Sequence, residues 1–256
     1  MNFAEMRRHV MLGVVGRIAR TPARELFVLR GGLLTSLWIA PVPRPTRDLD
    51  FVGDFAFDIE ATRAAFAPVL EVELADEVVF APGSLRASGL WLDSAFPGVR
   101  LQFRGGLGAV DQDLSIDVGF RDPLVPATVE HDIGGAAIRA IRPELQLAWK
   151  LHALAEMTAS WRPKDLADVA LILRHVPVVD EDLAAAIVPA FHSRGFSRAS
   201  AVELFDAAYW PTKTSRLRWE PREPALSDTL AEVRARLQPI LATLPDWSVQ
   251  SRELVL

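Results

Sequence analysis

The pattern of apolar and polar residues predicts that the first half of the chain forms a sheet flanked by a few helices. Apolar residues at helical spacing predict a helix over residues 3–20, and a short apolar run predicts a strand over 26–29. Turn signals such as Pro82-Gly83 separate the later apolar runs. Further helices are expected over residues 31–40 and 58–70, and further strands over 48–52, 78–80, 89–92, 99–103 and 114–120.

After Pro143 the pattern changes to helical periodicity. We therefore place a domain boundary near residue 141. The expected fold class is α+β, with a mixed-sheet domain over residues 1–141 followed by a helical domain over residues 142–256. In the second domain, helices are expected over residues 143–158, 163–174, 180–191, 198–208 and 226–243.

The composition is that of an ordinary globular protein, with 50% hydrophobic and 24% charged residues in a chain of 256. There is no cysteine, which excludes disulfides and thiolate metal sites and agrees with a reducing cytoplasm. No uninterrupted apolar run approaches the roughly 18 residues of a membrane span. Arg17 interrupts the apolar run near the N-terminus, so we expect an amphipathic helix there and a cytoplasmic protein without a membrane partner.

The net charge of −5 limits which nucleic acids the protein could hold. A protein that grips a long duplex is usually basic, because phosphate contacts dominate its affinity. We therefore expect any nucleic acid to be bound through a local patch, or only at a short end such as a tRNA terminus.

Two carboxylates lie on one face of the strand expected over residues 48–52. Successive side chains on a strand point to opposite faces, so Asp48 and Asp50 share a face. Upstream, Gly31 and Gly32 form a turn between a strand and a helix, where free backbone amides and the helix dipole favour phosphate. Together these features are typical of a site for Mg²⁺ and a nucleoside triphosphate.

A third carboxylate, Asp117, lies opposite the apolar face of the strand expected over residues 114–120. An unpaired charge is costly there, so either a cation or a basic side chain must lie against it. Asp113 shares the same face and is the alternative ligand if the strand begins earlier. Two Mg²⁺ ions bridged by three carboxylates would bind the triphosphate, activate an attacking hydroxyl and neutralise the leaving pyrophosphate.

A second charged group lies in the helical half. Lys150 interrupts the apolar face of its helix, and Asp165 and Asp168 lie three residues apart on the next helix, which Pro163 begins. A lysine directed across the domain interface would meet a triphosphate as a point charge.

These blocks resemble the AbiEii family of nucleotidyltransferases, the toxins of bacterial type IV toxin–antitoxin and phage-abortive systems, whose fold is that of the DNA polymerase β type. The family signature reads Gly-Gly, then Arg-x-Ser/Thr-x-Asp-hydrophobic-Asp, then Lys-Leu-x-Ala-Leu, then Arg-x-Lys/Arg-Asp-x-x-Asp. The resemblance covers about residues 25–175; the last 80 or so residues match no motif of the family and are expected to contact the acceptor. The matching residues are Gly31, Gly32, Arg44, Thr46, Asp48, Asp50, Lys150, Leu151, Ala153, Leu154, Arg162, Lys164, Asp165 and Asp168.

The resemblance implies an enzyme of the nucleotidyltransferase class that moves a nucleoside monophosphate from a triphosphate to an acceptor hydroxyl. For some members of the family the acceptor is a tRNA 3′ end, and a cognate antitoxin is the expected protein partner. Asp48, Asp50, Lys150 and Asp165 are the implied catalytic residues. The implied metal ligands are Asp48, Asp50 and Asp117, and the implied nucleotide-binding residues are Gly31, Gly32, Arg44, Thr46 and Lys150.

Each of these residues could instead have a purely structural role. Asp48 and Asp50 could pair with Arg44 and Arg47 at a strand end, and the glycines could serve only a tight turn. A lysine on an amphipathic helix commonly reaches solvent. Asp165 near a helix N-terminus stabilises the helix dipole, and Asp168 could pair with Arg162 or Lys164.

Two further features remain open. The tract over residues 210–219 places three basic residues between two tryptophans, which could stack on RNA bases or simply pack on the helical domain. His152 is expected to be a packed histidine rather than a general base. As alternatives to the toxin, the chain could be a non-catalytic binding module, or a transferase acting on a small molecule or a protein.

Overall fold

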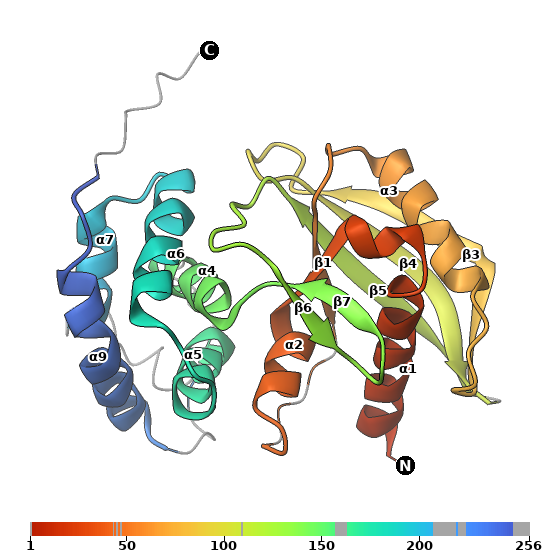
Figure 1. Cartoon of the computed structure of the whole chain (residues 1–256), viewed down its shortest axis with the longest axis horizontal. Coiled ribbons are helices and arrows are strands. Elements are labelled where there is room, and N and C mark those ends of the chain that lie inside the picture. The colour runs from red at the N-terminus through yellow and green to blue at the C-terminus, as the bar shows by residue number, and fades with distance from the viewer. Residues whose placement is uncertain are drawn as a thin grey trace. The chain divides into compact units, whose positions relative to one another are not determined.

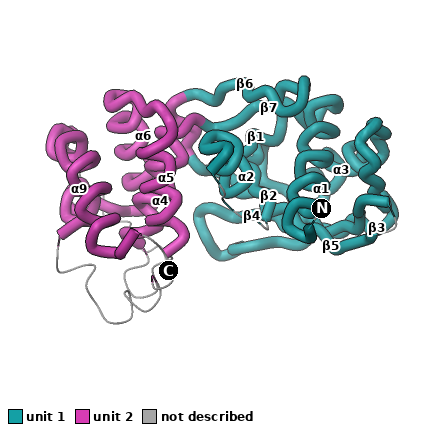
Figure 2. The backbone as a smooth tube through the Cα atoms, turned by 90° about the horizontal axis from the view of Figure 1, so that it is seen from below, with its two compact units in different colours: residues 1–122, 127–141 teal, residues 123–126, 142–256 magenta. Residues whose placement is uncertain are grey.

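The computed structural model describes residues 2–42, 44, 46, 48–108, 110–156, 163–206, 219 and 224–247. The chain divides into two compact units (Figure 2). The first, here called the sheet unit, comprises Met1–Asp122 and Ala127–Ile141. The second, here called the helical unit, comprises Pro123–Pro126 and Arg142–Leu256.

The sheet unit contains a seven-stranded sheet in the order β3-β4-β5-β2-β1-β7-β6 (Figure 1). The β2–β5 and β1–β7 pairs are parallel and the other pairs are antiparallel, so the sheet is mixed and the fold class is α+β. The strands are β1 (Phe27–Arg30), β2 (Leu49–Gly53), β3 (Val78–Leu90), β4 (Gly98–Leu107), β5 (Val110–Phe120), β6 (Val129–Asp132) and β7 (Ala137–Ala140).

One face of this sheet forms the core of the unit, under α1 (Phe3–Ile18) and α3 (Ile59–Phe66). The ring of Phe66 in α3 lies 6.0 Å from that of Phe27 and 5.5 Å from that of Phe103. Because side chains alternate along a strand, the residues between these core positions point to the opposite face. That opposite face carries the polar residues of the candidate site.

The helical unit contains α4 (Pro143–Glu156), α5 (Pro163–His175), α6 (Asp180–Ser193), α7 (Arg198–Val202) and α9 (Leu226–Ala242). Its core is formed by apolar side chains that recur at helical spacing, such as those of Leu147, Leu151, Leu166, Val169 and Ile187. Within the part of the chain that is described, none of the helices has both the length and the hydrophobicity to span a membrane.

The structure differs from the predicted elements in several places. The helix expected over 198–208 ends at Val202 and is followed by a 3₁₀ helix over Glu203–Phe205. The strands expected over 78–80 and 89–92 are parts of one strand, β3, whose pairing with β4 shifts register between Ala81 and Arg86. Strand β3 is at the sheet edge, where a proline and an irregularity are tolerated, so Pro82-Gly83 does not end it.

The helix expected over 58–70 ends at Phe66 and continues as a 3₁₀ helix over Ala67–Glu71, whose first turn contains Pro68. Strands β6 and β7 were not predicted. They are four residues long and pair with each other, and β7 also pairs with β1. The equally short β1 was predicted because it begins with a continuous apolar run, whereas charged residues interrupt the four positions of β6 and of β7.

Candidate active site

The chain passes from β1 directly into α2 (Gly31–Trp38) at Gly31, which has a φ of +76°. An added Cβ at Gly31 would overlap the carboxylate oxygen Oδ2 of Asp50 and lie 2.8 Å from Asp50 Cβ. Glycine is therefore required at this position for two reasons: the left-handed backbone and the close approach to Asp50. The N-terminus of α2 is in this way held directly against one of the predicted carboxylates.

The sheet register aligns four charged residues in a row across neighbouring strands. Asp50 in β2 is opposite Asp117 in β5, and Arg30 in β1 is opposite Asp50. Arg100 in β4 is opposite Asp117 on its other side. Residues in register on neighbouring strands have side chains on the same face, about 4.8 Å apart. The row Arg100–Asp117–Asp50–Arg30 therefore brings two carboxylates together between two arginines, of which Arg30 donates to Asp122 at 3.2 Å.

Asp117 is held by Arg100 in a bidentate ion pair, in which Arg100 Nε and Nη2 donate to the two carboxylate oxygens at 2.7 Å each. The hydrogen bond to Asp117 raises the pKa of the Arg100 guanidinium, although burial acts in the opposite direction. The sequence required a cation or a basic side chain at Asp117, and the structure places a basic side chain there. Arg100 was not predicted, although its position between buried Val99 and Leu101 marks it as a residue of the polar face.

Asp48 lies immediately before β2 and is exposed, whereas Asp50 is half-buried. The charge of Asp48 contributes to the raised pKa of Arg100, which places Asp48 near the same row. Strand β5 begins at Val110, so Asp113 also belongs to it, opposite Arg104. The register nevertheless sets Asp117 beside Asp50, while Asp113 is four residues further along the strand.

The remaining predicted nucleotide-binding residues of the sheet unit lie around Gly32. An added Cβ at Gly32 would overlap Arg44 Nη1 and lie 2.6 Å from Thr46 Oγ1. The Thr46 hydroxyl donates to the backbone carbonyl of Asp48 at 3.2 Å, which connects this loop to the start of β2. The structure thus gathers Gly31, Gly32, Arg44, Thr46, Asp48, Asp50 and Asp117 at one place on the sheet unit.

The donor atoms of this site fit a hard divalent cation in part. Carboxylate oxygens are the ligands that Mg²⁺ prefers, and Asp48 and Asp50 supply them beside the N-terminus of α2. Both oxygens of Asp117 accept a hydrogen bond from Arg100, and each keeps a second lone pair through which it could still bind a metal. The described residues contain no ready-made group of three acidic, histidine or cysteine side chains around one point.

The charged group of the helical unit forms a compact cluster of its own. Lys150 in α4 donates to Asp165 Oδ1 at 3.0 Å and lies 2.7 Å from Asp168 Oδ2, both in α5. The three side chains are 11%, 10% and 4% exposed, so Lys150 is turned toward two buried carboxylates rather than extended into solvent. The partner expected for Asp168 was Arg162 or Lys164, and the structure shows Lys150. Arg162 lies outside the described residues.

The tract over residues 210–219 lies outside the described residues except for Trp219. That side chain is 4% exposed, and its indole nitrogen donates to the carbonyl oxygen of Pro224 at 3.0 Å. His152 is buried in α4, where its ring packs against Phe191. Trp219 and His152 are thus both packed within the helical unit.

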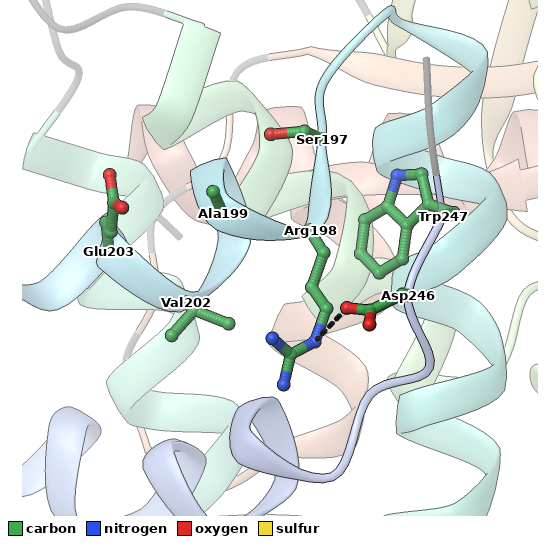
Figure 3. Close-up of a pocket in the computed structure, with 7 residues that line it drawn as sticks. All are labelled: Ser197, Arg198, Ala199, Val202, Glu203, Asp246 and Trp247. Carbon is green, nitrogen blue, oxygen red and sulfur yellow. Dashed lines mark ion pairs between the residues drawn. The ribbon is translucent and has the colours of Figure 1, made fainter. Parts of the chain in front are cut away.

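A pocket of about 470 Å³ in the helical unit contains none of the predicted site residues (Figure 3). In it, Arg198 lies 3.6 Å from Asp246 and donates to the carbonyl oxygens of Ala242 and Leu244, at the end of α9. Because this guanidinium closes a helix end, we assign the pocket a structural role. It is lined by Ser197, Arg198, Ala199, Val202, Glu203, Asp246 and Trp247.

Comparison with solved structures identifies the fold. A putative nucleotidyltransferase from H. pylori superimposes with a TM-score of 0.53 at 17% identity, covering 95% of this chain and 97% of that one. JHP933 from Helicobacter pylori superimposes with a TM-score of 0.51 at 18% identity, covering 92% and 90%. None of the curated proteins compared with the chain is significantly similar to it. The fold is that of the nucleotidyltransferases.

The family follows from the sequence itself. The model of the nucleotidyl transferase AbiEii toxin family of type IV toxin–antitoxin systems matches residues 14–252. The chain belongs to this family, as its motifs predicted. The match extends well beyond residues 25–175, so it includes most of the C-terminal helices, in which no family motif was recognised from the sequence.

Proposed function

We propose that the protein is a Mg²⁺-dependent nucleotidyltransferase that transfers a nucleoside monophosphate from a nucleoside triphosphate to an acceptor hydroxyl, with a tRNA 3′ end as the acceptor. The observation that carries this proposal is the packing of Gly31 against Asp50, which sets the N-terminus of α2 beside a carboxylate pair. The family, in which toxins act within type IV toxin–antitoxin systems, supports a cognate antitoxin as the protein partner.

In this proposal the sheet unit performs two tasks. The backbone amides at Gly31 and Gly32, with the dipole of α2, hold the β- and γ-phosphates. Asp48, Asp50 and Asp117 would hold two Mg²⁺ ions, which when bound would lower the pKa of the attacking hydroxyl and neutralise the leaving group. Arg100 orients Asp117 through its two hydrogen bonds, and each Asp117 oxygen would still have a lone pair for a metal ion.

The reaction is an in-line displacement at the α-phosphorus. The acceptor oxygen forms the new O–P bond, its proton passes to a carboxylate of the site or to water, and the bond to the β-phosphate breaks. The products are the nucleotidylated acceptor and pyrophosphate. In this proposal the helical unit also contributes to transfer. Lys150 and Asp165 belong to the later family motifs, and Lys150 neutralises phosphate charge.

The test is transfer of label from α-³²P nucleoside triphosphates to total tRNA with Mg²⁺ present. We expect the natural protein to label tRNA and Asp50→Asn to lose more than about 100-fold in rate, since loss of a residue that merely orients a metal ligand already costs about 10–100-fold. Asp113→Asn is the matched control, because Asp113 is an exposed carboxylate on the same face of β5.

Each other result has a definite meaning. Equal transfer by Asp50→Asn would overturn the assignment of the site. A loss in Asp113→Asn with none in Asp117→Asn would make Asp113 the third ligand. Triphosphate binding without any labelled RNA would move the acceptor to a small molecule or a protein side chain, and the absence of both would indicate a non-catalytic module.

A further inference from the structure

An exposed tryptophan lies at the end of the hairpin formed by β3 and β4. Trp91 follows the last residue of β3, is 58% exposed, and has a φ of +50°. A bulky side chain in the left-handed region is strained, and such strain persists where the surrounding structure imposes it, often at ligand-binding sites. Neither the hydrophobic core nor the proposed phosphate site makes use of this residue.

The indole ring lies on the same face of the sheet as the charged row. A Cβ added to Gly98 would lie 3.1 Å from Trp91 Cζ3 and 3.2 Å from Cε3, so the ring covers Gly98. Gly98 is two residues before Arg100 on β4 and therefore presents the same face. Its register partner, Gly119, is likewise two residues beyond Asp117 on β5. Trp91 thus adjoins the row Arg100–Asp117–Asp50–Arg30.

The geometry of an in-line displacement indicates which of the two substrates, the triphosphate or the acceptor, lies on the side of Trp91. In the proposed function, the phosphates that leave are held at Gly31, which lies at the β1–β2 side of the row. An in-line attack enters opposite the leaving phosphates, so a triphosphate laid along the row would be attacked from the side of β5 and β4. The ring over Gly98 lies there, two strands and two residues from Asp50, or about 12 Å by ideal sheet spacings.

The neighbouring edge strand adds a positive charge on the same face. Arg86 in β3 is opposite Gln102 of β4, is exposed, and takes part in no ion pair among the described residues. Gln102 is four residues along β4 from Gly98, so Arg86 and the ring are roughly 13 Å apart on one face by ideal strand spacing. An exposed aromatic ring and an exposed cation on one face can hold a single-stranded nucleic acid, by base stacking and by a contact to a more distant phosphate. They also supply the local patch that an acidic protein needs to hold an RNA end.

We propose that Trp91 positions the acceptor by stacking on the nucleobase next to the attacking hydroxyl, with Arg86 contacting a phosphate of the same strand. This inference rests on the proposed function, in which the acceptor is a polynucleotide end. It assigns a substrate contact to the hairpin between β3 and β4, a segment outside every motif that led to the family.

The experiment compares Trp91→Ala, Trp91→Phe and the control Leu92→Ala, whose side chain is equally exposed at 59%. Transfer kinetics would give the KM for tRNA and the KM for the triphosphate separately. We expect Trp91→Ala to raise the KM for tRNA roughly tenfold to hundredfold with the KM for the triphosphate unchanged. Trp91→Phe should restore most of the affinity, because it retains an aromatic face, and Leu92→Ala should resemble the natural protein.

A binding measurement separates failure of this inference from failure of the proposed function. The probe is a 5′-fluorescein single-stranded RNA with a free 3′ hydroxyl, followed by anisotropy without triphosphate. Weaker binding by Trp91→Ala, with binding by Asp50→Asn preserved, would support the stacking role even if no transfer were detected. A raised KM for the triphosphate alone would assign the ring to the incoming nucleotide and overturn the proposal. Unchanged binding and kinetics in folded Trp91→Ala would overturn it as well.

Discussion

At the scale of single residues, Gly31 shows how a local backbone choice creates the site. Its φ of +76° and its contact with Asp50 are separate constraints, and Gly135 meets only the first, with a φ of +77° and nothing within 4 Å of an added Cβ. We expect Gly135→Ala to cost about 1 kcal/mol of folding free energy through backbone strain alone. Gly31→Ala should cost about 2–4 kcal/mol, because Asp50 or α2 must also move.

Urea unfolding of both variants measures the two costs, and the transfer assay measures the consequence for the site. Gly31→Ala is expected to be inactive under conditions where it remains folded, whereas Gly135→Ala should keep full activity. Equal destabilisation of the two variants would show that the approach of Gly31 to Asp50 imposes no constraint of its own.

At the scale of elements, Lys150 joins α4 to α5 through two carboxylates that are both at least 90% buried. We expect Lys150→Met to destabilise the protein by about 3–5 kcal/mol, because it leaves buried charges without their partner. The triple variant Lys150→Met/Asp165→Asn/Asp168→Asn removes all three charges and should recover most of that stability.

Urea unfolding of the single and triple variants checks this expectation, and transfer activity then separates two roles. A stable triple variant without activity would support the catalytic role that the family motif implies for Lys150. A stable and active triple variant would show that the cluster only holds α4 against α5.

A second connection between elements involves Arg17 of α1 and Asp76, which precedes β3. Arg17 is buried and donates to both Asp76 oxygens, at 2.6 and 3.0 Å. Burial alone would raise the pKa of Asp76, but the hydrogen bonds and charge of Arg17, with the amide of Val78, hold it below its ordinary value. Because the folded-state pKa is depressed, the ion pair stabilises the protein above about pH 4 and this contribution is lost as the pH falls further.

We therefore expect Asp76→Asn to lower the free energy of unfolding by about 2–4 kcal/mol at pH 7, with the difference from the natural protein shrinking toward pH 3. Urea unfolding at several pH values tests this. Glu60→Gln provides the control, since Glu60 pairs with Arg63 on the surface and should cost less than about 1 kcal/mol at any pH. A difference for Asp76→Asn that did not change with pH would contradict the assignment.

At the scale of the whole molecule, the positions of the charged residues matter more than the net charge. The net charge of −5 argues against a general affinity for polyanions. Within the sheet unit, however, two arginines flank the carboxylate pair in the register of the sheet. An overall acidic protein can in this way still offer a phosphate-handling surface, which agrees with the nucleotidyltransferase family to which the chain belongs.

The sequence alone determined the features that depend on neighbouring residues. The shared face of Asp48 and Asp50 follows from strand alternation, and the helices after Pro143 follow from their apolar period. The family motifs were visible for the same reason, since each is a short run of residues. The fold class could therefore be predicted from the chain's own pattern, and the comparisons with known proteins confirm it.

Only the tertiary structure decided which distant residues meet. Arg100 holds Asp117, Gly31 packs on Asp50, and Trp91 covers Gly98, and each of these contacts depends on strand register or on a turn. Register is set by the whole sheet, because shifting a strand by one residue would turn its polar side chains into the core. For this reason the sequence could name the carboxylates of the site, whereas their partners became known only from the folded chain.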